Sequence, residues 1–414
     1  MKTKMKRESK SLVYGLIVVV LILSVSFMFA GKGITAAAEE TLKIGLIGPM
    51  DRPNTVDQIH MDEIYAEMID KAGGLSIGGQ KYKIKFIFYD HKNDLAAGRA
   101  AVNRLIFEDK VKFIFSGFSA VTDGLIPITE ANKVVLITNT PSPTILKPNI
   151  NYGFNVGYIP SLPIISTTWF FKSHPEFKHI VDALPDHQTG HLVAADQKRI
   201  FQSIAGVKCD IEFYPPTATD LSALGTKVKK MNPDVFQSAG GGPLLDALAN
   251  KAVYAAGWRG PFFQGTPSTA VAMERLVPPE VLEGYVLPGA PFEFDPPLTQ
   301  VAKDFMAAWM AKYGKYQGEV LGDFMWECLA AALQKAGSTD PEKVAAVIGN
   351  GLKFESVDSG TFQMVARPDL GNKRTVDSAC TLYLKKIVKG KPVLMETVPL
   401  EKTVALYEAF NSKK

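Results

Sequence analysis

Short apolar segments alternate with helix-like segments along the first half of the chain. Residues 82–90 alternate lysines with Ile84, Phe86 and Phe88, a period of two that predicts a strand. Residues 55–72 follow a helical period and stop at Gly73-Gly74, where glycine can take the left-handed conformation that ends a helix. We also predict strands at 42–48, 112–116 and 134–138, and helices that begin after Asp94 and near Ser119.

The alternation restarts after a stretch with Pro and Gly at 152–163. We predict strands at 179–184, 209–214, 234–238 and 261–264, with Asp220 as the N-cap of a helix over 221–230. A second Pro-rich break at 288–298 precedes helices at 299–313, 319–336 and 340–349, and residues 360–398 return to strands. Repeated β–α units of this length predict an α/β fold with parallel-type sheets flanked by helices on both faces.

The first 38 residues have the pattern of a cleaved export signal. A basic start is followed by an uncharged apolar run over 12–30, and Ala36, Ala37 and Ala38 suit cleavage after Ala38, with Ala30 as the alternative. A retained anchor is the other interpretation, because a span needs roughly 17–25 apolar residues. Small and polar residues dilute the run, so we favour cleavage. Either way we expect the rest of the chain in the periplasm, and the segment has no Cys for lipid attachment.

The net charge changes once the signal is set aside. Of the 46 Lys and Arg and the 42 Asp and Glu residues, six and one lie in residues 1–38, which leaves 40 and 41 and a net charge of −1. A near-neutral chain without a basic run argues against nucleic acid as a partner. Cys209, Cys328 and Cys380 allow at most one disulfide and lack metal-ligand spacing, and Cys328 is interpreted as a core residue.

Five segments in order resemble one family. They are KIGLIGPM at 43–50, DKAGGLSIGGQKYKIKFIFYD at 70–90, YPPTATDLSALGTKVKKMNPDVF at 214–236, AAGWRGPFFQGT at 255–266 and AGSTDPEKVAAVI at 336–348. The chain resembles the type I periplasmic solute-binding proteins of the branched-chain amino-acid ABC transporter family over almost all of its length after residue 38. The resemblance implies two α/β lobes joined by three hinge crossovers, with ligand in the cleft between them.

The resemblance also implies lobe bounds and partners. Lobe 1 would comprise residues 39–158 plus 296–355, and lobe 2 residues 159–295 plus 356–414, with crossovers near 158, 295 and 355. The expected partners are a small solute and an ABC permease in the inner membrane. We expect a monomer without a cofactor.

In lobe 1, two loops are candidates to bind a ligand carboxylate. The loop with Phe118 and Ser119 would present a hydroxyl and helix N-terminal amides to the anion. Alternatively, Ser119 only caps its own helix. Asn139, Thr140 and Ser142 follow the next strand and match a family loop that binds the same carboxylate, although turn formation alone also explains these residue types.

Further candidates lie at the first crossover and in lobe 2. Tyr158 either walls the pocket or packs in the hinge. His187 or Thr189 stands where relatives often place an aromatic residue over the ligand. Gly241 lies in a glycine run that replaces a second aromatic residue expected from the family. His187 and His191 have a spacing that suits zinc on a helix, but no third ligand is evident, so we expect no metal.

Thr266 is the sharpest departure from the family. Relatives commonly carry an acidic residue near this position that pairs with the ligand ammonium, and Thr266 cannot supply that charge. The departure leaves open whether the ligand is an α-amino acid. Arg52 is a candidate to meet an anion, and Phe118, Tyr158 and Phe263 are candidates to surround an apolar or aromatic body.

The sequence favours a binding protein over an enzyme. It contains no G-x-S-x-G, H-E-x-x-H or G-x-x-x-x-G-K-[ST] motif. The leading hypothesis is the solute receptor of an ABC importer, binding an amino acid or a related organic acid or amide. The alternatives are a ligand-sensing subunit of a membrane signalling partner and a secreted hydrolase.

Overall fold

The computed structural model describes residues 40–412, apart from 51–52, 118, 140–143, 158–161, 205, 266–267 and 317–323. The chain separates into two units, Met1–Glu40 and Thr41–Lys414, and of the first only Glu40 is described. The predicted export signal therefore lies outside the described residues. Among the helices that are described, none is long and apolar enough to cross a membrane.

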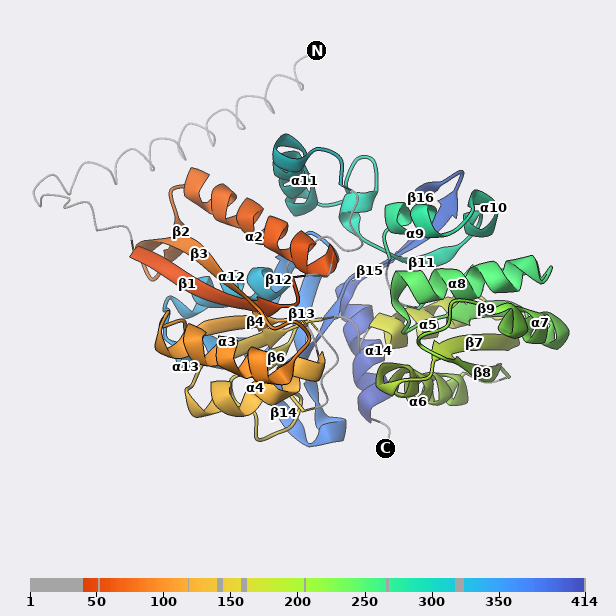
Figure 1. The fold of residues 1–414 in the computed structure, drawn as a ribbon, viewed down its shortest axis with the longest axis horizontal. Helices are drawn as coiled ribbons and strands as arrows, with labels where there is room; N and C mark the ends of the chain where they lie inside the picture. Colours follow the sequence, from red (N-terminus) through yellow and green to blue (C-terminus); the bar gives the residue numbers. More distant parts are fainter. Residues whose placement is uncertain are drawn as a thin grey trace, which may run out of the picture. The chain divides into compact units, whose positions relative to one another are not determined.

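The first sheet has six described strands in the order β2-β3-β1-β4-β5-β6 (Figure 1). These strands are β2 (Leu75–Ile77), β3 (Gln80–Asp90), β1 (Glu40–Gly48), β4 (Phe113–Ser116), β5 (Val135–Thr138) and β6 (Gly153–Asn155). The pairs β1–β4, β4–β5 and β5–β6 are parallel, and β2–β3 is antiparallel. Phe113 and Phe115 pack on one face of the sheet and Ile114 on the other, so both faces are buried.

Helices cover both faces of this sheet. The side of Ile114 is covered by α3 and α4, and the side of Phe113 by α12. The bounds here are α2 (Pro53–Lys71), α3 (Leu95–Phe107), α4 (Ser119–Ala131), α12 (Phe324–Ala336) and α13 (Pro341–Ile348). Asp94 caps α3 as predicted, because its carboxylate accepts the Ala97 N–H at 2.7 Å.

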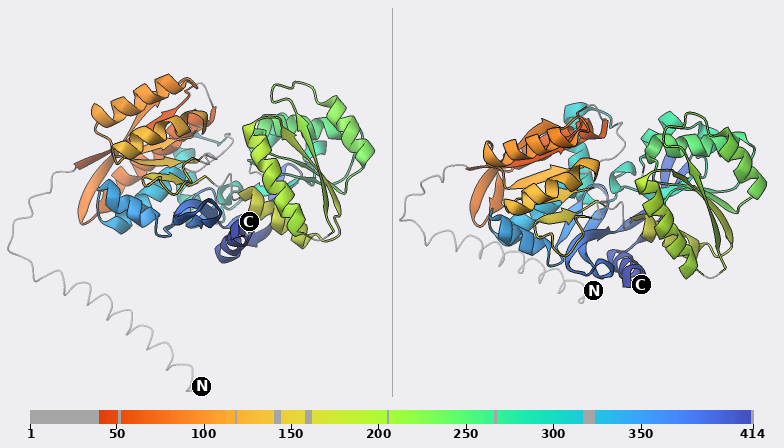
Figure 2. Two further views of the ribbon diagram at one scale, coloured as in Figure 1. Left: turned by 90° about the horizontal axis from the view of Figure 1, so that it is seen from below. Right: turned by 60° about the horizontal axis from the view of Figure 1, so that its bottom comes forward.

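The second sheet has seven described strands in the order β16-β15-β11-β10-β9-β7-β8. They are β16 (Lys391–Val398), β15 (Leu382–Val388), β11 (Val286–Gly289), β10 (Phe262–Phe263), β9 (Val235–Ser238), β7 (His179–Pro185) and β8 (Lys208–Tyr214). The pairs from β8 to β11 are parallel, whereas β15 and β16 pair antiparallel. Figure 2 shows the parallel strands between two layers of helices.

The helices of this half are α5 (Leu162–Ser173), α6 (Gln188–Ser203), α7 (Ser222–Met231), α8 (Gly242–Ala255), α9 (Ala270–Leu276) and α10 (Pro279–Leu282). The prediction of Asp220 as an N-cap is wrong by one residue. Leu221 occupies the cap position, and Asp220 accepts the Ser222 N–H at 2.8 Å from outside the helix. The carboxylate still satisfies a free helical N–H, which explains the misplacement.

A third sheet of antiparallel strands was not predicted. It contains β12 (Lys353–Ser356), β13 (Gly360–Arg367) and β14 (Asn372–Cys380) in that order. The remaining elements are η1 (Pro291–Glu293), α11 (Gln300–Tyr313), η2 (Pro368–Leu370) and α14 (Leu400–Ser412). The α/β class is confirmed. Parallel pairing, as expected, joins β1, β4, β5 and β6 in the first sheet and β7 to β11 in the second. The pairs β2–β3, β11–β15 and β15–β16 and the whole third sheet are antiparallel instead.

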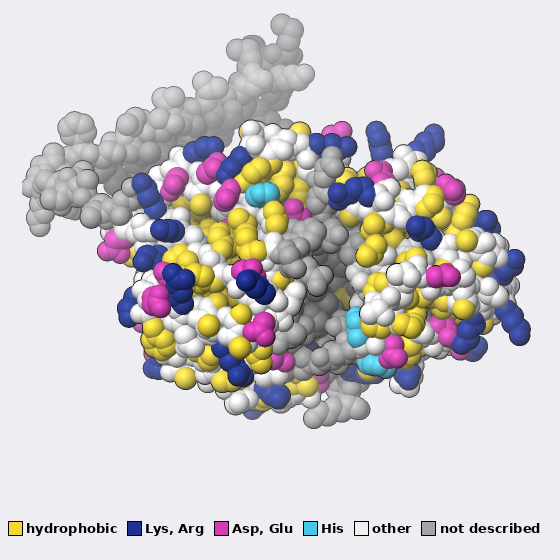
Figure 3. All heavy atoms as spheres, viewed as in Figure 1, with side chains coloured by type: hydrophobic (Ala, Val, Ile, Leu, Met, Phe, Trp, Pro, Cys, Tyr) yellow, Lys and Arg dark blue, Asp and Glu magenta, His cyan; other side chains and the backbone are white. Residues whose placement is uncertain are grey.

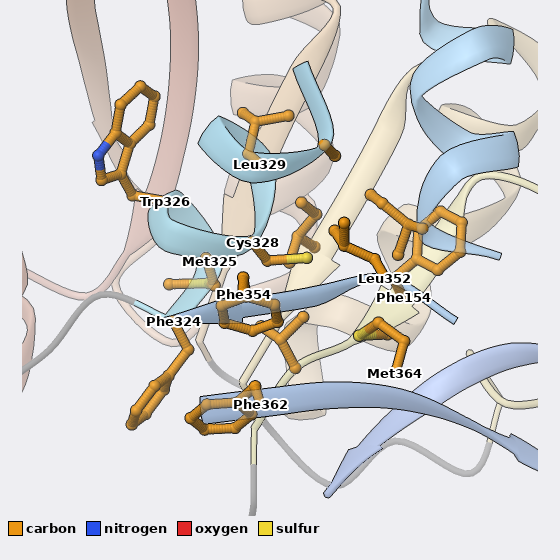
Figure 4. Close-up of a cluster of buried hydrophobic side chains, with 14 of the residues drawn as sticks. Phe154, Phe324, Met325, Trp326, Cys328, Leu329, Leu352, Phe354, Phe362 and Met364 are labelled. Carbon is orange, nitrogen blue, oxygen red and sulfur yellow. The ribbon is translucent and has the colours of Figure 1, made fainter. Parts of the chain in front are cut away.

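The largest core cluster joins α12 to the third sheet. Figure 4 shows Cys328 and Met325 of α12 beside Phe354 and Phe362 of β12 and β13, and the rings of these two phenylalanines stack with centroids 5.0 Å apart. Cys328 has no exposed surface, which confirms its interpretation as a core residue. The chain's three cysteines all fall within the described residues and are free thiols.

Charges of both signs are mixed over the described surface. In Figure 3, Lys and Arg side chains alternate with Asp and Glu over the visible face, and no patch of one sign dominates. This distribution agrees with the near-neutral charge of the chain after residue 38. It offers no electrostatic footprint for a polyanion on that face.

Candidate functional site

Three parallel strands of the first sheet end side by side around Asn139. Gly117, Asn139 and Gly157 follow β4, β5 and β6 closely in the chain. A Cβ on Gly117 would lie 3.1 Å from the Asn139 Oδ1 atom, and one on Gly157 only 2.1 Å from the Asn139 carbonyl oxygen. The two glycines therefore let three loops converge, and the Asn139 side chain lies at their junction, half-buried.

Helix α4 begins at this junction. Its first residue is Ser119, three positions beyond the end of β4, so the free N–H groups and the positive dipole end of α4 lie at the strand end. Buried beneath them, the Ser116 and Thr122 hydroxyls share a hydrogen bond of 2.7 Å that ties β4 to α4. The predicted strand–turn–helix is confirmed, and a ligand contact by Ser119 stays a prediction.

The loop after β1 is fixed by Asp90 at the end of β3. The Asp90 carboxylate accepts the Lys92 N–H at 2.8 Å and the Met50 N–H at 3.3 Å. These backbone hydrogen bonds, that of Lys92 foremost, lower the pKa of Asp90. Asp90 thus holds the start of the loop that contains Arg52, the residue predicted to meet an anion.

In the second half of the chain, His187 caps α6 directly after β7. Its Nδ1 atom accepts the Gly190 N–H at 3.1 Å. His191 instead contacts Asp186, with 2.8 Å between Nε2 and Oδ1. The two histidines thus have separate partners, and the described residues contain no group of three or more His, Cys, Asp or Glu that could hold a metal.

The loops after β7 and β9 pack closely through glycines. A Cβ on Gly190 would lie 1.9 Å from the Pro185 carbonyl oxygen, and one on Gly240 would lie 3.9 Å from the Gly190 Cα. Gly240 has a φ of +74°, which favours glycine. Gly241 is the N-cap of α8, and its N–H donates to the Asp246 Oδ1 atom at 3.3 Å. The glycine run thus shapes the start of α8.

Two buried acids lie behind these loops and were not singled out from the sequence. Asp182 in β7 and Asp246 in α8 both have no exposed surface. Burial raises the pKa of Asp246 to about 7, and burial together with the charge of Asp246 raises that of Asp182 well above its ordinary value. A signal for Asp182 was available, since it is the one acid in the otherwise apolar strand HIVDALP.

The end of β10 is anchored on both sides. The Tyr285 hydroxyl donates to the Gln264 Oε1 atom at 2.8 Å, and the Gln264 Nε2 atom donates to the Ser268 hydroxyl at 3.0 Å. The Ser166 hydroxyl of α5 donates to the Gly265 carbonyl oxygen at 2.8 Å. These contacts hold residues 264, 265 and 268, on either side of Thr266 in the chain.

The prediction that Phe263 surrounds part of the ligand is wrong. Its ring stacks on Phe170 with the centroids 4.3 Å apart and the planes 8° apart, and the side chain has no exposed surface. It belongs to the core between β10 and α5, because a strand with both faces covered points each side chain into a helix layer. It is therefore not free to surround a ligand.

Several predicted residues lie outside the described residues or have side chains that are not described. The first group comprises Arg52, Phe118, Thr140, Ser142, Tyr158 and Thr266. The second group is Ser119 and Thr189, which lie in α4 and α6. Of the predicted site residues, Asn139 lies at the junction with the loop that leads into α4, and His187 contacts Gly190, which in turn lies beside Gly240.

Known proteins resemble this chain over most of its length. A family model described as periplasmic binding protein matches residues 41–377. The leucine-, isoleucine-, valine-, threonine- and alanine-binding protein of Pseudomonas aeruginosa is 28% identical over 329 residues, which are 76% of this chain and 84% of that protein.

Solved structures share the fold at lower sequence identity. A leucine-binding protein of Thermotoga maritima superposes with a TM-score of 0.67 at 18% identity and covers 87% of this chain and 100% of its own. A solute-binding protein of an ABC transporter from Rhodopseudomonas palustris, in complex with 3,4-dihydroxybenzoic acid, gives a TM-score of 0.66 at 20% identity and covers 87% of this chain and 98% of its own.

Proposed function

We propose that this chain, which belongs to the periplasmic binding protein family, is the solute receptor of an ABC importer of the type I branched-chain amino-acid group. The solute is a small molecule with a carboxylate group. It binds between the two lobes, which close over it by a hinge, and the closed complex docks on a permease in the inner membrane. Binding favours the closed state through differential affinity.

The junction around Asn139 is the observation that carries this proposal. Three parallel strands end there beside the first turn of α4. Gly117 and Gly157 have no side chain, which lets their loops approach Asn139 closely. Ligands of α/β proteins bind at the carboxyl ends of parallel strands, and a helix N-terminus favours an anion. A carboxylate fits that polarity, with the Asn139 amide as a further donor.

The relatives support a carboxylate rather than one particular acid. The protein of Pseudomonas aeruginosa is named for amino acids, and that of Rhodopseudomonas palustris holds an aromatic acid. The carboxylate is the group these ligands share. Thr266 supplies no charge for an ammonium group, which favours an organic acid without one.

Residues 1–38 direct export and are removed, and the protein works in the periplasm as a monomer without a cofactor. Lobe 1 comprises 39–158 plus 296–355, and lobe 2 comprises 159–295 plus 356–414.

Thermal unfolding in the presence of matched ligands tests the proposal. Leucine, isoleucine, benzoate and 3,4-dihydroxybenzoate are each compared with the corresponding amide, which lacks the negative charge. We expect at least one acid to raise the melting temperature and its amide not to, because a ligand at 100 times its Kd stabilises by about 2.7 kcal/mol. Equal stabilisation by an acid and its amide, or by none of the acids, contradicts the proposal.

A pair of variants locates the carboxylate. Asn139→Ala removes the amide at the junction, and Asn103→Ala removes an exposed asparagine of α3 whose side chain donates to the Arg99 carbonyl oxygen of the same helix. We expect the first variant to weaken binding of the active acid about ten-fold, as for loss of a hydrogen bond to a charged group, and the second to leave it unchanged. Wild-type affinity in Asn139→Ala places the carboxylate elsewhere.

A further inference from the structure

A buried ion pair lies next to the segment that follows β10. The Lys385 ammonium lies 2.5 Å from both carboxylate oxygens of Glu293, and the two side chains are 0% and 6% exposed. Lys385 belongs to β15, and Glu293 ends η1 just after β11. These residues are 92 positions apart in the chain.

Both members of the pair also hold the backbone after β10. The Lys385 Nζ atom donates to the Ser268 carbonyl oxygen at 2.8 Å. The Glu293 Oε1 atom accepts the Ala270 N–H at 2.8 Å, at the first residue of α9. The Glu293 Oε2 atom accepts the Ala290 N–H at 2.8 Å, which fixes the carboxylate to its own turn. Two charges thus tie residues 268–270 to β15 and η1.

Stability alone does not account for such a pair. Removing two charges from water costs several kcal/mol per ion, so apolar residues of the same volume often serve the fold as well. An ion pair differs from apolar packing because its hydrogen bonds are directional, and each one holds its partner group in one geometry. Here those bonds converge on residues 268–270.

The position of the tied segment gives it a role. It follows the carboxyl end of β10, the side of a parallel sheet on which ligands bind. Nearer the strand, the Gly265 carbonyl oxygen accepts the Ser166 hydroxyl at 2.8 Å. Glu293 lies two residues before the crossover predicted near 295, so the tie would join the strand end to that predicted crossover.

We propose that Glu293 and Lys385 are positioning residues of the solute site, which hold residues 268–270 in the geometry that binds solute. This inference rests on the proposed function for the solute, whereas the tie itself does not depend on a ligand. The pair touches no ligand in this role and acts through the backbone that it holds.

The test compares Lys385→Met, Glu293→Gln and the double variant with a matched control, Lys386→Met. Lys386 is the next residue of β15 and is exposed. Hydrogen exchange of the Ala270 amide is measured without ligand, the unfolding midpoint is measured by urea, and affinity is measured for leucine and 3,4-dihydroxybenzoate.

We expect Lys385→Met to speed exchange at Ala270 about ten-fold while exchange in β7 stays unchanged, because opening is local. Affinity for the active probe falls about ten-fold, since the binding geometry is no longer prepared in advance. The double variant has a higher urea midpoint than Lys385→Met, because it buries no unpaired charge at this site. Its affinity stays as low as that of Lys385→Met. Lys386→Met behaves as the wild type.

Two results would overturn the inference. One is wild-type exchange at Ala270 in Lys385→Met, and the other is affinity that returns together with the midpoint in the double variant. If the wild type binds neither probe, the choice of solute fails, and exchange at Ala270 still decides whether the pair holds this segment.

Discussion

Asp246→Asn separates the electrostatics of the second sheet from its packing. Asp246 is fully buried in α8, and its Oδ1 atom accepts the N–H of Gly241, the N-cap residue. Its Oδ2 atom has no hydrogen-bond partner among the described residues. Asparagine keeps the acceptor for Gly241 and nearly the same volume, and it removes the charge that forms as the pH rises.

The magnitude follows from the pKa of Asp246, which burial raises from 3.8 to about 7. The folded state therefore holds a proton that the unfolded chain releases, and stability falls as the pH rises from about 4 to about 7. For these two values the loss between pH 5 and pH 8 is about 2–3 kcal/mol. The variant lacks this loss. It also removes the charge that helps to raise the pKa of Asp182, which shifts the titration of Asp182 downward.

The assay is urea unfolding at pH 5 and pH 8 for the wild type, Asp246→Asn and an exposed control, Asp70→Asn. We expect the free energy of unfolding of Asp246→Asn to gain on the wild type by about 2–3 kcal/mol between the two pH values. Asp70→Asn should follow the wild type at both. Equal pH dependence in Asp246→Asn and the wild type would refute the reasoning, since Asp246 would then titrate alike in the folded and unfolded chains.

Three further predictions concern close packing, surface charge and thiols. Gly157→Ala places a Cβ 2.1 Å from a backbone oxygen and should cost about 1–3 kcal/mol of unfolding free energy, whereas Gly117→Ala meets only a side-chain oxygen at 3.1 Å and should cost less; equal losses contradict this. Glu342→Gln breaks an ion pair with Lys133 whose side chains are 57% and 65% exposed, and the urea midpoint should match that of the wild type, because solvent screens an exposed pair; a clearly lower midpoint contradicts this. Burial raises the pKa of all three thiols, that of Cys380 to about 12, so a thiol reagent at pH 8 should react at once only after unfolding; rapid reaction of the native protein contradicts this.

Local chemistry made most of the elements predictable. The caps at Asp94, Thr299 and Asp340 each accept an N–H three residues later, so the local sequence is enough to place these three helix starts. The strands 112–116 and 134–138 were placed by apolar runs, and the structure differs from them by one residue at the N-terminal end. Asn139 became a candidate through the family resemblance of its loop, and the parallel pairing of β4, β5 and β6 explains why the loop meets its neighbours there.

Strand partners and orientation were less accessible. The segment 360–398 was predicted as strands, but nothing in its period says that β13 and β14 form a separate sheet while β15 and β16 join β11. An antiparallel partner buries the same alternating face as a parallel one, so the pattern alone does not distinguish them. Leu384, for example, satisfies its apolar position opposite Pro288 in an antiparallel register.

The residues found only in the structure share a physical role. The predicted site residues follow strand ends directly, because side chains there can reach a ligand. Asp246, Glu293 and Lys385 are instead buried, and each forms a hydrogen bond to the backbone of a glycine-containing loop. Glu293 and Lys385 resemble ordinary surface residues in the sequence, and only tertiary contact makes each the partner that lets the other be buried. Ligand affinity in this chain should therefore depend on residues that never touch the ligand, to an extent set by how many loop hydrogen bonds each one holds.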